Sequence, residues 1–404
     1  MNNDQLSLQR PRWRAALAAS ASIAAAAFLV ACGGGGDATP TAGTPAAATS
    51  YSQGAITGFG SVFVGGVRFD DSTAEVADDD GNSRSRSDLK LGMMVEVDGG
   101  NIDRASSTAQ ALRIRWGSEI VGPVGTINPV ASTFRVLGQT VLVTSSTVFD
   151  SSLAGGLSAL TAGAVIEVHG ILDPANARVV ATRIEPKVGV LAFKLRGAIT
   201  SLDTTAKTFR INGELISYAG LPSGNVPPGL TNGQVVRVLL QTTQVAGVWV
   251  ATGLRGGLRL PEARQEAHVE GVITVFTSAT NFEISGLRVD ASSARFPDGS
   301  AGIVLGTRVE VEGTVSNGVL VAREVEIEER RTPEQRQLEL RGEMSNLSST
   351  AKTFALRGVT VWYGGTVEYR DGTEATLANN RRVEVKGVLS SDRTRLEARK
   401  IEFK

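Results

Sequence analysis

The chain has 404 residues, of which 42% are hydrophobic and 20% charged, so its composition is globular and its length allows several domains. The chain has 41 basic and 41 acidic residues and therefore no net charge. This excludes long-range electrostatic attraction of the whole protein to nucleic acid or to an anionic surface. With 46 glycines, 5% aromatic residues and one cysteine, the composition favours short strands and many turns without disulfides.

The first 31 residues are typical of an export signal. Three arginines precede an apolar run, residues 15–31, that is too short and too rich in alanine to indicate a membrane span. The run ends in Leu-Val-Ala immediately before Cys32, which resembles the lipobox of bacterial lipoproteins. We therefore expect residues 1–31 to be a lipoprotein signal peptide and Cys32 to receive a lipid anchor.

The next segment, residues 32–53, is rich in glycine, alanine, threonine and proline and has no apolar periodicity. Such a segment buries too little surface to offset its ordering entropy, so we expect a flexible tether. Gly33 differs from the aspartate that resembles an inner-membrane retention signal. The expected location is therefore the bacterial cell envelope, at the outer membrane.

One pentapeptide recurs five times beyond the tether. It reads VEVDG from residue 95, IEVHG from 166, VRVLL from 236, VEVEG from 309 and VEVKG from 383, at spacings of 71, 70, 73 and 74. The alternation places the first and third residues of each copy inward, towards a core. Each copy is the fourth strand of its unit, because three strand patterns precede it and one follows.

Four further markers keep the same period. They are an opening glycine (Gly54, Gly122, Gly197, Gly271, Gly342), a phenylalanine expected in the core (Phe63, Phe134, Phe209, Phe282, Phe354), a turn residue (Gly92, Gly163, Gly233, Gly306, Asn380) and an alanine (Ala111, Ala181, Ala251, Ala322, Ala398). Because asparagine replaces glycine in the fifth turn, that position is expected to need a left-handed backbone. The shared period indicates five tandem repeats, at 54–117, 118–187, 188–258, 259–331 and 332–404.

Each repeat contains strand patterns only. In the third, RGAITSLD alternates, KTFRINGELISY forms two runs joined by Asn212-Gly213, and QVVRVLL and VWVATGL form a second pair. Three strands, a connector with room for at most one short helix and a two-stranded hairpin match the OB-fold. The sequence therefore predicts an all-β chain of five small OB-like five-stranded barrels. Such small disulfide-free barrels are expected to dock against their neighbours.

The stretch GFGSVFVGGVRFD from residue 58, followed by DLKLGMMVEVDG from residue 88, resembles the bacterial domain-of-unknown-function 5666 family. Members of that family are often lipoproteins with tandem copies. The resemblance covers residues 54–404 and implies architecture and location. It implies no catalytic residues.

The sequence contains two histidines, His169 and His268, in different repeats. Equivalent positions in other repeats carry either charge, so both are expected to face solvent. This leaves a histidine-based zinc site or a catalytic triad without support. We therefore expect no catalytic, cofactor-binding or metal-binding residues.

The recurring carboxylates Glu96, Glu167, Glu310 and Glu384 are interpreted as a solvated strand face. They lie in separate repeats, too far apart to act as a glycosidase pair. Basic residues of the following strand, such as Arg183, Arg323 and Arg399, are expected to be their cross-strand partners.

Residues 78–83, DDDGNS, resemble a calcium loop only weakly, because Gly81 comes too early and Leu89 stands where a closing glutamate is needed. A mobile acidic connector is the preferred interpretation. A nucleic-acid partner is not expected, because OB-folds bind single strands with exposed aromatic residues in a basic groove and here the basic pairs are dispersed.

The sequence therefore favours a non-enzymatic, lipid-anchored envelope protein whose barrels bind a protein or glycan partner or act as a spacer. Two alternatives remain open. One is an envelope hydrolase with a carboxylate or serine site at a repeat interface, and the other is a calcium-responsive binding module.

Overall fold

The computed structural model describes residues 48–257, 261–330 and 337–404, and Ala46–Lys404 form one compact unit. The expected signal peptide, Cys32 and most of the tether lie outside the described residues. Within the described residues every helix is a short 3₁₀ turn and all other regular structure is strand. No helix in this part of the chain is long and apolar enough to cross a membrane.

The strands form five barrels, numbered here in chain order. Barrel one contains β1 (Ser50–Ala55), β2 (Gly58–Phe59), β3 (Val62–Val64), β4 (Val67–Asp70), β5 (Glu75–Asp78), η1 (Arg86–Asp88), β6 (Met94–Gly99) and β7 (Thr108–Trp116). Barrel two contains β8 (Ile120–Asn128), β9 (Thr133–Val136), β10 (Gln139–Phe149), η2 (Gly156–Ala159), β11 (Val165–Asp173), η3 (Pro174–Asn176) and β12 (Arg178–Pro186).

Barrel three contains β13 (Phe193–Ala198), β14 (Thr200–Asp203), β15 (Thr208–Ile211), β16 (Glu214–Ser217), η4 (Ser223–Asn225), β17 (Val235–Leu240) and β18 (Trp249–Gly256). Barrel four contains β19 (Arg264–Ser278), β20 (Asn281–Ile284), β21 (Leu287–Asp290), η5 (Ser300–Gly302), β22 (Arg308–Ser316), β23 (Val319–Ile327) and η6 (Glu328–Arg330). Barrel five contains β24 (Leu338–Ser348), β25 (Thr353–Leu356), β26 (Val359–Trp362), β27 (Glu368–Arg370), η7 (Glu374–Thr376), β28 (Arg382–Leu389) and β29 (Leu396–Phe403).

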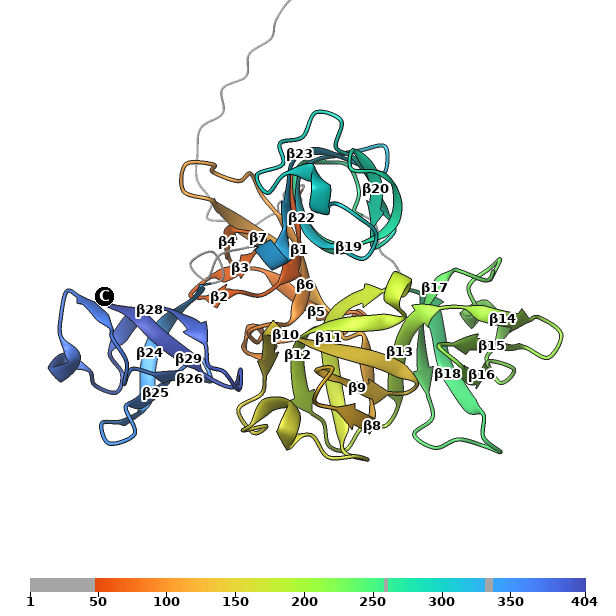
Figure 1. Ribbon diagram of the computed structural model, residues 1–404, viewed down its shortest axis with the longest axis horizontal. Coiled ribbons are helices and arrows are strands. Elements are labelled where there is room, and N and C mark those ends of the chain that lie inside the picture. Colours follow the sequence, from red (N-terminus) through yellow and green to blue (C-terminus); the bar gives the residue numbers. More distant parts are fainter. Residues whose placement is uncertain (1–47, 258–260, 331–336) are drawn as a thin grey trace, which may run out of the picture. The chain divides into compact units, whose positions relative to one another are not determined.

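Strand pairing in barrel four shows how each unit closes. Strand β19 pairs antiparallel with β20, β20 with β21, and β21 runs parallel to β23; β22 then pairs with both β23 and β19 and completes the ring (Figure 1). A single long first strand serves both sides, because its first half pairs with β22 and its second half with β20. The same order recurs in the other barrels, so the predicted OB-like fold is confirmed.

Inward-facing residues fill the barrels as the alternation predicts. Val309 and Val311 are fully buried. So are four of the five marker phenylalanines, Phe134, Phe209, Phe282 and Phe354, none of which is more than 1% exposed. These side chains belong to the apolar clusters of their barrels.

The prediction for the remaining marker, Phe63, is wrong. Val62 and Val64 are buried in barrel one, while Phe63 between them is only half-buried and lies under the guanidinium of Arg68. The tight turn at Gly65 follows this strand one residue earlier than in the other barrels. Because side chains alternate, that shift turns Phe63 away from the core.

The glycine that ends the pentapeptide and the recurring alanine belong to one feature, a β-bulge. In barrel four Gly313 pairs with Ala322, while Glu312 before it pairs with Glu324, so Arg323 is the extra residue. The same shift occurs at Gly99, Gly170 and Gly387, which pair with Ala111, Ala181 and Ala398, and Leu240 pairs with Ala251 in barrel three. The bulge explains why the two markers recur together.

The turn before the fourth strand has the left-handed backbone that the sequence predicts. Its φ is +80° to +85° at the four glycines and +67° at Asn380. We expect Asn380→Val to destabilise barrel five by about 1–2 kcal/mol, because a β-branched side chain tolerates this conformation poorly. Asn380→Gly should be neutral or slightly stabilising. Thermal unfolding of both variants checks this; equal losses in the two would contradict it.

The predicted tether is too long at its end. Residues 50–53 are the first residues of β1, with Ser50, Tyr51 and Ser52 buried, because they pair with β6 along its whole length. The sequence did not predict the start of β1, because its first residues are mostly polar and show no apolar alternation.

Pairing between first strands links barrels within the compact unit. Strand β8 pairs with β13, which joins barrels two and three as the docking expectation requires. Strand β1 pairs in parallel with β19, which joins barrels one and four although they are not neighbours in sequence. Within its own barrel, this part of the first strand pairs with the fourth strand on one side only. Its other edge pairs with the neighbouring barrel.

Candidate functional site

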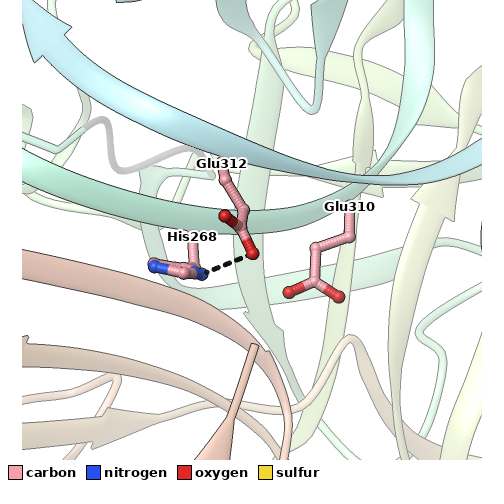
Figure 2. Close-up of side chains that lie close together, drawn as sticks. All are labelled: His268, Glu310 and Glu312. Atoms are coloured by element: carbon pink, nitrogen blue, oxygen red, sulfur yellow. Dashed lines mark ion pairs between the residues drawn. The ribbon is translucent and has the colours of Figure 1, made fainter. Parts of the chain in front are cut away.

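The candidate site lies on the outer face of barrel four, where β19 and β22 run antiparallel. His268 stands directly opposite Glu312, and Glu270 stands opposite Glu310. Since side chains alternate along a strand, all four project from the same face, while Val269 and Val311 between them fill the core. Figure 2 shows the imidazole of His268 beside the carboxylates of Glu312 and Glu310.

Most of this face is buried, with Glu312 half-buried, which corrects the expectation that its residues face solvent. His268 is 7% exposed and Glu310 is 7% exposed. The inference failed because a residue that points out of a barrel reaches water only if nothing else covers it. Here Gly65 of barrel one lies against the site: a Cβ atom there would be 2.9 Å from the Cβ of His268.

Three possible metal ligands converge at this place. A ring nitrogen of His268 and one carboxylate oxygen each from Glu310 and Glu312 lie within 4.8 Å of one another. Nδ1 of His268 is 3.4 Å from Oε1 of Glu312. Among the described residues, no other group of three histidine, cysteine, aspartate or glutamate side chains gathers this closely.

Arginines balance much of the negative charge around the site. Arg323 lies 3.0 Å from Oε2 of Glu312 and 2.6 Å from Oε1 of Glu266. On the same face, Nε of Arg308 donates to Oε1 of Glu270 at 2.7 Å. Interaction with His268, assisted by Arg323 and opposed by burial, lowers the pKa of Glu312 to about 2.

The low pKa of Glu312 predicts a pH dependence. Because an unfolded glutamate has a pKa of about 4.3, the unfolded chain binds this proton more readily, so stability is full above about pH 5 and falls towards pH 2. With 34% of the side chain exposed, solvent screening reduces the contribution to about 1 kcal/mol. Glu312→Gln should flatten the fall in melting temperature between pH 5 and pH 3. An unchanged slope would contradict this assignment.

The second histidine, His169, is also buried rather than solvent-facing. It is 0% exposed in barrel two, its Nδ1 is 3.0 Å from the carbonyl oxygen of Gly117, and its ring lies against Trp116. Burial lowers the pKa of His169, so the ring is neutral near pH 7. Its carboxylate neighbour Glu167 is held 2.6 Å from Nζ of Lys187.

The recurring carboxylates are not a solvated face, although they lie in different barrels as expected. Glu167 and Glu384 are 3% and 5% exposed, and Glu96 is half-buried. Glu384 lies 2.9 Å from Nε of Arg341 on the first strand of its barrel. On the fifth strand of barrel one, Arg115 lies 4.0 Å from Glu96, as expected. The three arginines named from the sequence are not such partners: Arg183 contacts Glu185 and Asp150, Arg323 contacts Glu312 and Glu266, and Arg399 is exposed.

Strand register supplies the physical reason for that error, because Glu310 lies opposite Glu326 and Glu384 lies opposite Glu402 on the fifth strand. Arg323 in barrel four and Arg399 in barrel five are the extra residues of the bulge. Neither arginine therefore lies opposite the recurring glutamate of its barrel.

The acidic segment 78–83 is engaged in ion pairs and is not a free connector. Asp78 is 5% exposed, and its carboxylate is 2.6 Å from Arg84. Asp79 is 3.0 Å from Nζ of Lys194 and 2.7 Å from Arg237. Burial opposes ionisation of Asp79, but these two cations outweigh it and lower its pKa.

A cavity of about 600 Å³ adjoins this segment. Its walls include Asp79, Glu119 and Arg237. Burial raises the pKa of Glu119, with Arg196 at 3.3 Å opposing the rise. The cavity therefore holds one carboxyl group with a raised pKa and one with a lowered pKa, both within reach of basic side chains.

Sequence reasoning missed the convergence of His268 with Glu310 and Glu312. From the sequence, His268 and Glu310 are each expected to face solvent. A signal was nevertheless present, because the opening glycine and the pentapeptide fix the pairing of the first and fourth strands. Counting from Gly271 opposite Val309 places His268 opposite Glu312.

The fold defines the described part of the chain as a tandem array of small OB-like barrels. Three segments match the model of the family described as "Domain of unknown function (DUF5666)": residues 121–185, 270–326 and 341–402. These three segments lie in barrels two, four and five, and their match confirms the resemblance to this family that the sequence shows.

Comparison with solved structures gives a weaker likeness. The structure of drosophila Unr CSD456 is 13% identical, over 54% of this chain and 99% of that chain, with a TM-score of 0.13. Because that score is low, nothing about this chain is inferred from it. No curated protein matches the chain.

Proposed function

We propose that this protein is a lipid-anchored protein of the bacterial cell envelope, at the outer membrane, whose barrels bind a protein or glycan partner or act as a spacer. The observation that carries the proposal is the sequence of residues 1–31, which is typical of an export signal and directly precedes Cys32, together with the five copies of one small barrel that follow. The role is non-enzymatic and needs no cofactor. Repetition suits it, because several copies of a weak site raise the avidity for an extended partner.

The anchoring part is tested by metabolic labelling. Cells that express the chain are grown with an alkyne-bearing fatty acid, and the chain is then purified and conjugated to a fluorophore. The wild-type chain should carry the label and fractionate with outer membranes, whereas Cys32→Ser should lose the label and leave the membrane fraction. A labelled Cys32→Ser variant, or an unlabelled wild-type chain, would refute the anchor.

The binding part is tested by crosslinking in intact cells. A photoreactive residue is placed at exposed positions, one for each barrel: Arg113, Val130, Lys207, Val321 and Arg357. Capture of the same envelope protein or glycan from several barrels would support binding by repeated copies. Capture from none of the positions would favour the spacer role.

The alternative of an envelope hydrolase has one observation in its favour. In the cavity beside Glu119, burial raises the pKa of one carboxyl group while that of Asp79 is lowered, an arrangement that acid–base catalysis uses. Against it, Asp79 is already paired with Lys194 and Arg237. Hydrolysis of chromogenic esters or glycosides by the wild-type chain, abolished in Glu119→Gln, would support this alternative and refute the non-enzymatic role.

The calcium-responsive alternative relies on residues 78–83. Asp78, Asp79 and Asp80 are each paired with arginine or lysine, so calcium would have to displace these cations. A rise in melting temperature with calcium that is lost in Asp78→Asn would nevertheless support it.

A further inference from the structure

We propose that His268, Glu310 and Glu312 of barrel four bind one divalent transition-metal ion of the zinc class. One nitrogen and two carboxylate oxygens of these residues lie within 4.8 Å of one another, so small side-chain movements bring all three into the first coordination sphere of one ion. The proposal adds a ligand-binding site to the barrel and is independent of the anchor and of the partner.

The strand register holds the three ligands in place. His268 is directly opposite Glu312, and Glu310 follows Glu312 by two positions on the same face. The backbone of two paired strands therefore supports the site, which is stiffer than a loop. An ion here would join β19 to β22 across the ladder that closes the barrel.

His268 provides the observation that points to a ligand. Its Nδ1 is buried and makes no hydrogen bond of regular geometry, although it interacts with Oε1 of Glu312 across 3.4 Å (Figure 2). A buried ring nitrogen with so weak a contact costs free energy, whereas a metal ion between the two groups would use its lone pair. The other ring nitrogen, Nε2, lies 3.6 Å from Glu266, a carboxylate that orients and polarises a metal-bound histidine.

The local charge also accommodates a cation. Four glutamates lie on this face, Glu266, Glu270, Glu310 and Glu312, and the arginines that contact them are Arg104, Arg308 and Arg323. Because Arg323 takes Oε2 of Glu312, the other oxygen of that carboxylate remains directed towards His268. The metal and the arginine thus share one carboxylate, which predicts moderate affinity.

The ligand set selects the class of ion. Imidazole nitrogen favours zinc, copper, nickel and iron, while calcium and magnesium prefer oxygen alone and more ligands than three. Three protein ligands leave coordination positions for water or for a group of a partner.

Barrel two supplies a natural control, because it carries the same residue types in exchanged positions. Glu119 and His169 adjoin the paired residues Ile120 and Val168, and Glu167 precedes His169 by two residues. In that barrel Nζ of Lys187 forms an ion pair with Glu167, and Nδ1 of His169 lies 3.0 Å from the carbonyl oxygen of Gly117. The histidine and one of the two glutamates of barrel two thus already have other partners.

The test uses the purified full-length chain without a polyhistidine tag, titrated with zinc chloride alone by calorimetry and monitored by thermal unfolding. We expect one ion per chain and a higher melting temperature. His268→Gln and, independently, Glu312→Gln should each weaken zinc binding by at least about tenfold. His169→Gln should bind zinc as the wild-type chain does.

Two results would overturn the proposal: no zinc binding by the wild-type chain, or wild-type affinity in both barrel-four variants. Circular dichroism of the metal-free variants separates a lost ligand from a lost fold. If His268→Gln does not fold, Glu312→Gln decides the matter, because a glutamine keeps the size of the side chain and removes its charge. Calcium chloride is the control ion. Any effect of calcium on the melting temperature should be the same in Glu312→Gln as in the wild-type chain.

Discussion

Replacing Phe282 with alanine is expected to lower the free energy of unfolding of barrel four by about 3–5 kcal/mol. Phe282 is 1% exposed and packs in the apolar cluster that contains Ile273 and Val311. Its removal leaves a cavity that the closed ring of strands cannot collapse to fill. Hydrogen exchange measured for each barrel shows whether the loss is confined to barrel four.

The matched control is Phe63→Ala in barrel one. Phe63 occupies the second strand, as Phe282 does, but it is half-buried and lies outside the apolar core of its barrel. Its loss should therefore cost no more than about 1 kcal/mol. If both variants lost the same stability, the assignment of Phe63 to the outer face would be wrong.

The barrel fold could be predicted because its determinants are local and repeated. The valines of the pentapeptide alternate with a period of two, and the turns at Gly306 and Asn380 need a left-handed backbone, which their residue types reveal. Asn212-Gly213 predicted a hairpin that joins β15 to β16. Because each pattern occurs in five copies, the prediction of strands and turns is stronger than any single copy would allow.

The candidate site could not be predicted in the same way, because it depends on what covers a strand and on register across strands. Alternation separates the two faces of a strand, but it does not distinguish water from another barrel. His268 and His169 therefore received the same assignment to solvent as any charged strand residue. The partners expected for Glu310 and Glu384 were wrong for a second reason, because the register places Glu326 and Glu402 opposite them on the fifth strand. A one-residue bulge also shifts the register of each of these strand pairs and leaves little trace in hydrophobicity.

That bulge did leave one trace, the glycine at the end of the pentapeptide. A Cβ atom on Gly313 would lie 2.1 Å from the carbonyl oxygen of Val321 and 2.9 Å from the Cα atom of Ala322. The same contact with a backbone carbonyl limits Gly170 and Gly387. The glycine is thus required by the close approach of two strands.

Gly313→Val is accordingly expected to destabilise barrel four by about 3 kcal/mol, near the upper end for overpacking, because the obstructing atoms belong to the backbone and cannot change rotamer. Gly220→Val is the control, since a Cβ atom there meets nothing within 4 Å; it should change stability by less than about 0.5 kcal/mol. Chemical denaturation with barrel-resolved hydrogen exchange measures both. Wild-type stability of Gly313→Val would mean that β22 and β23 separate readily at the bulge. In that case the register that brings His268 opposite Glu312 would rest on β19 and β22 alone.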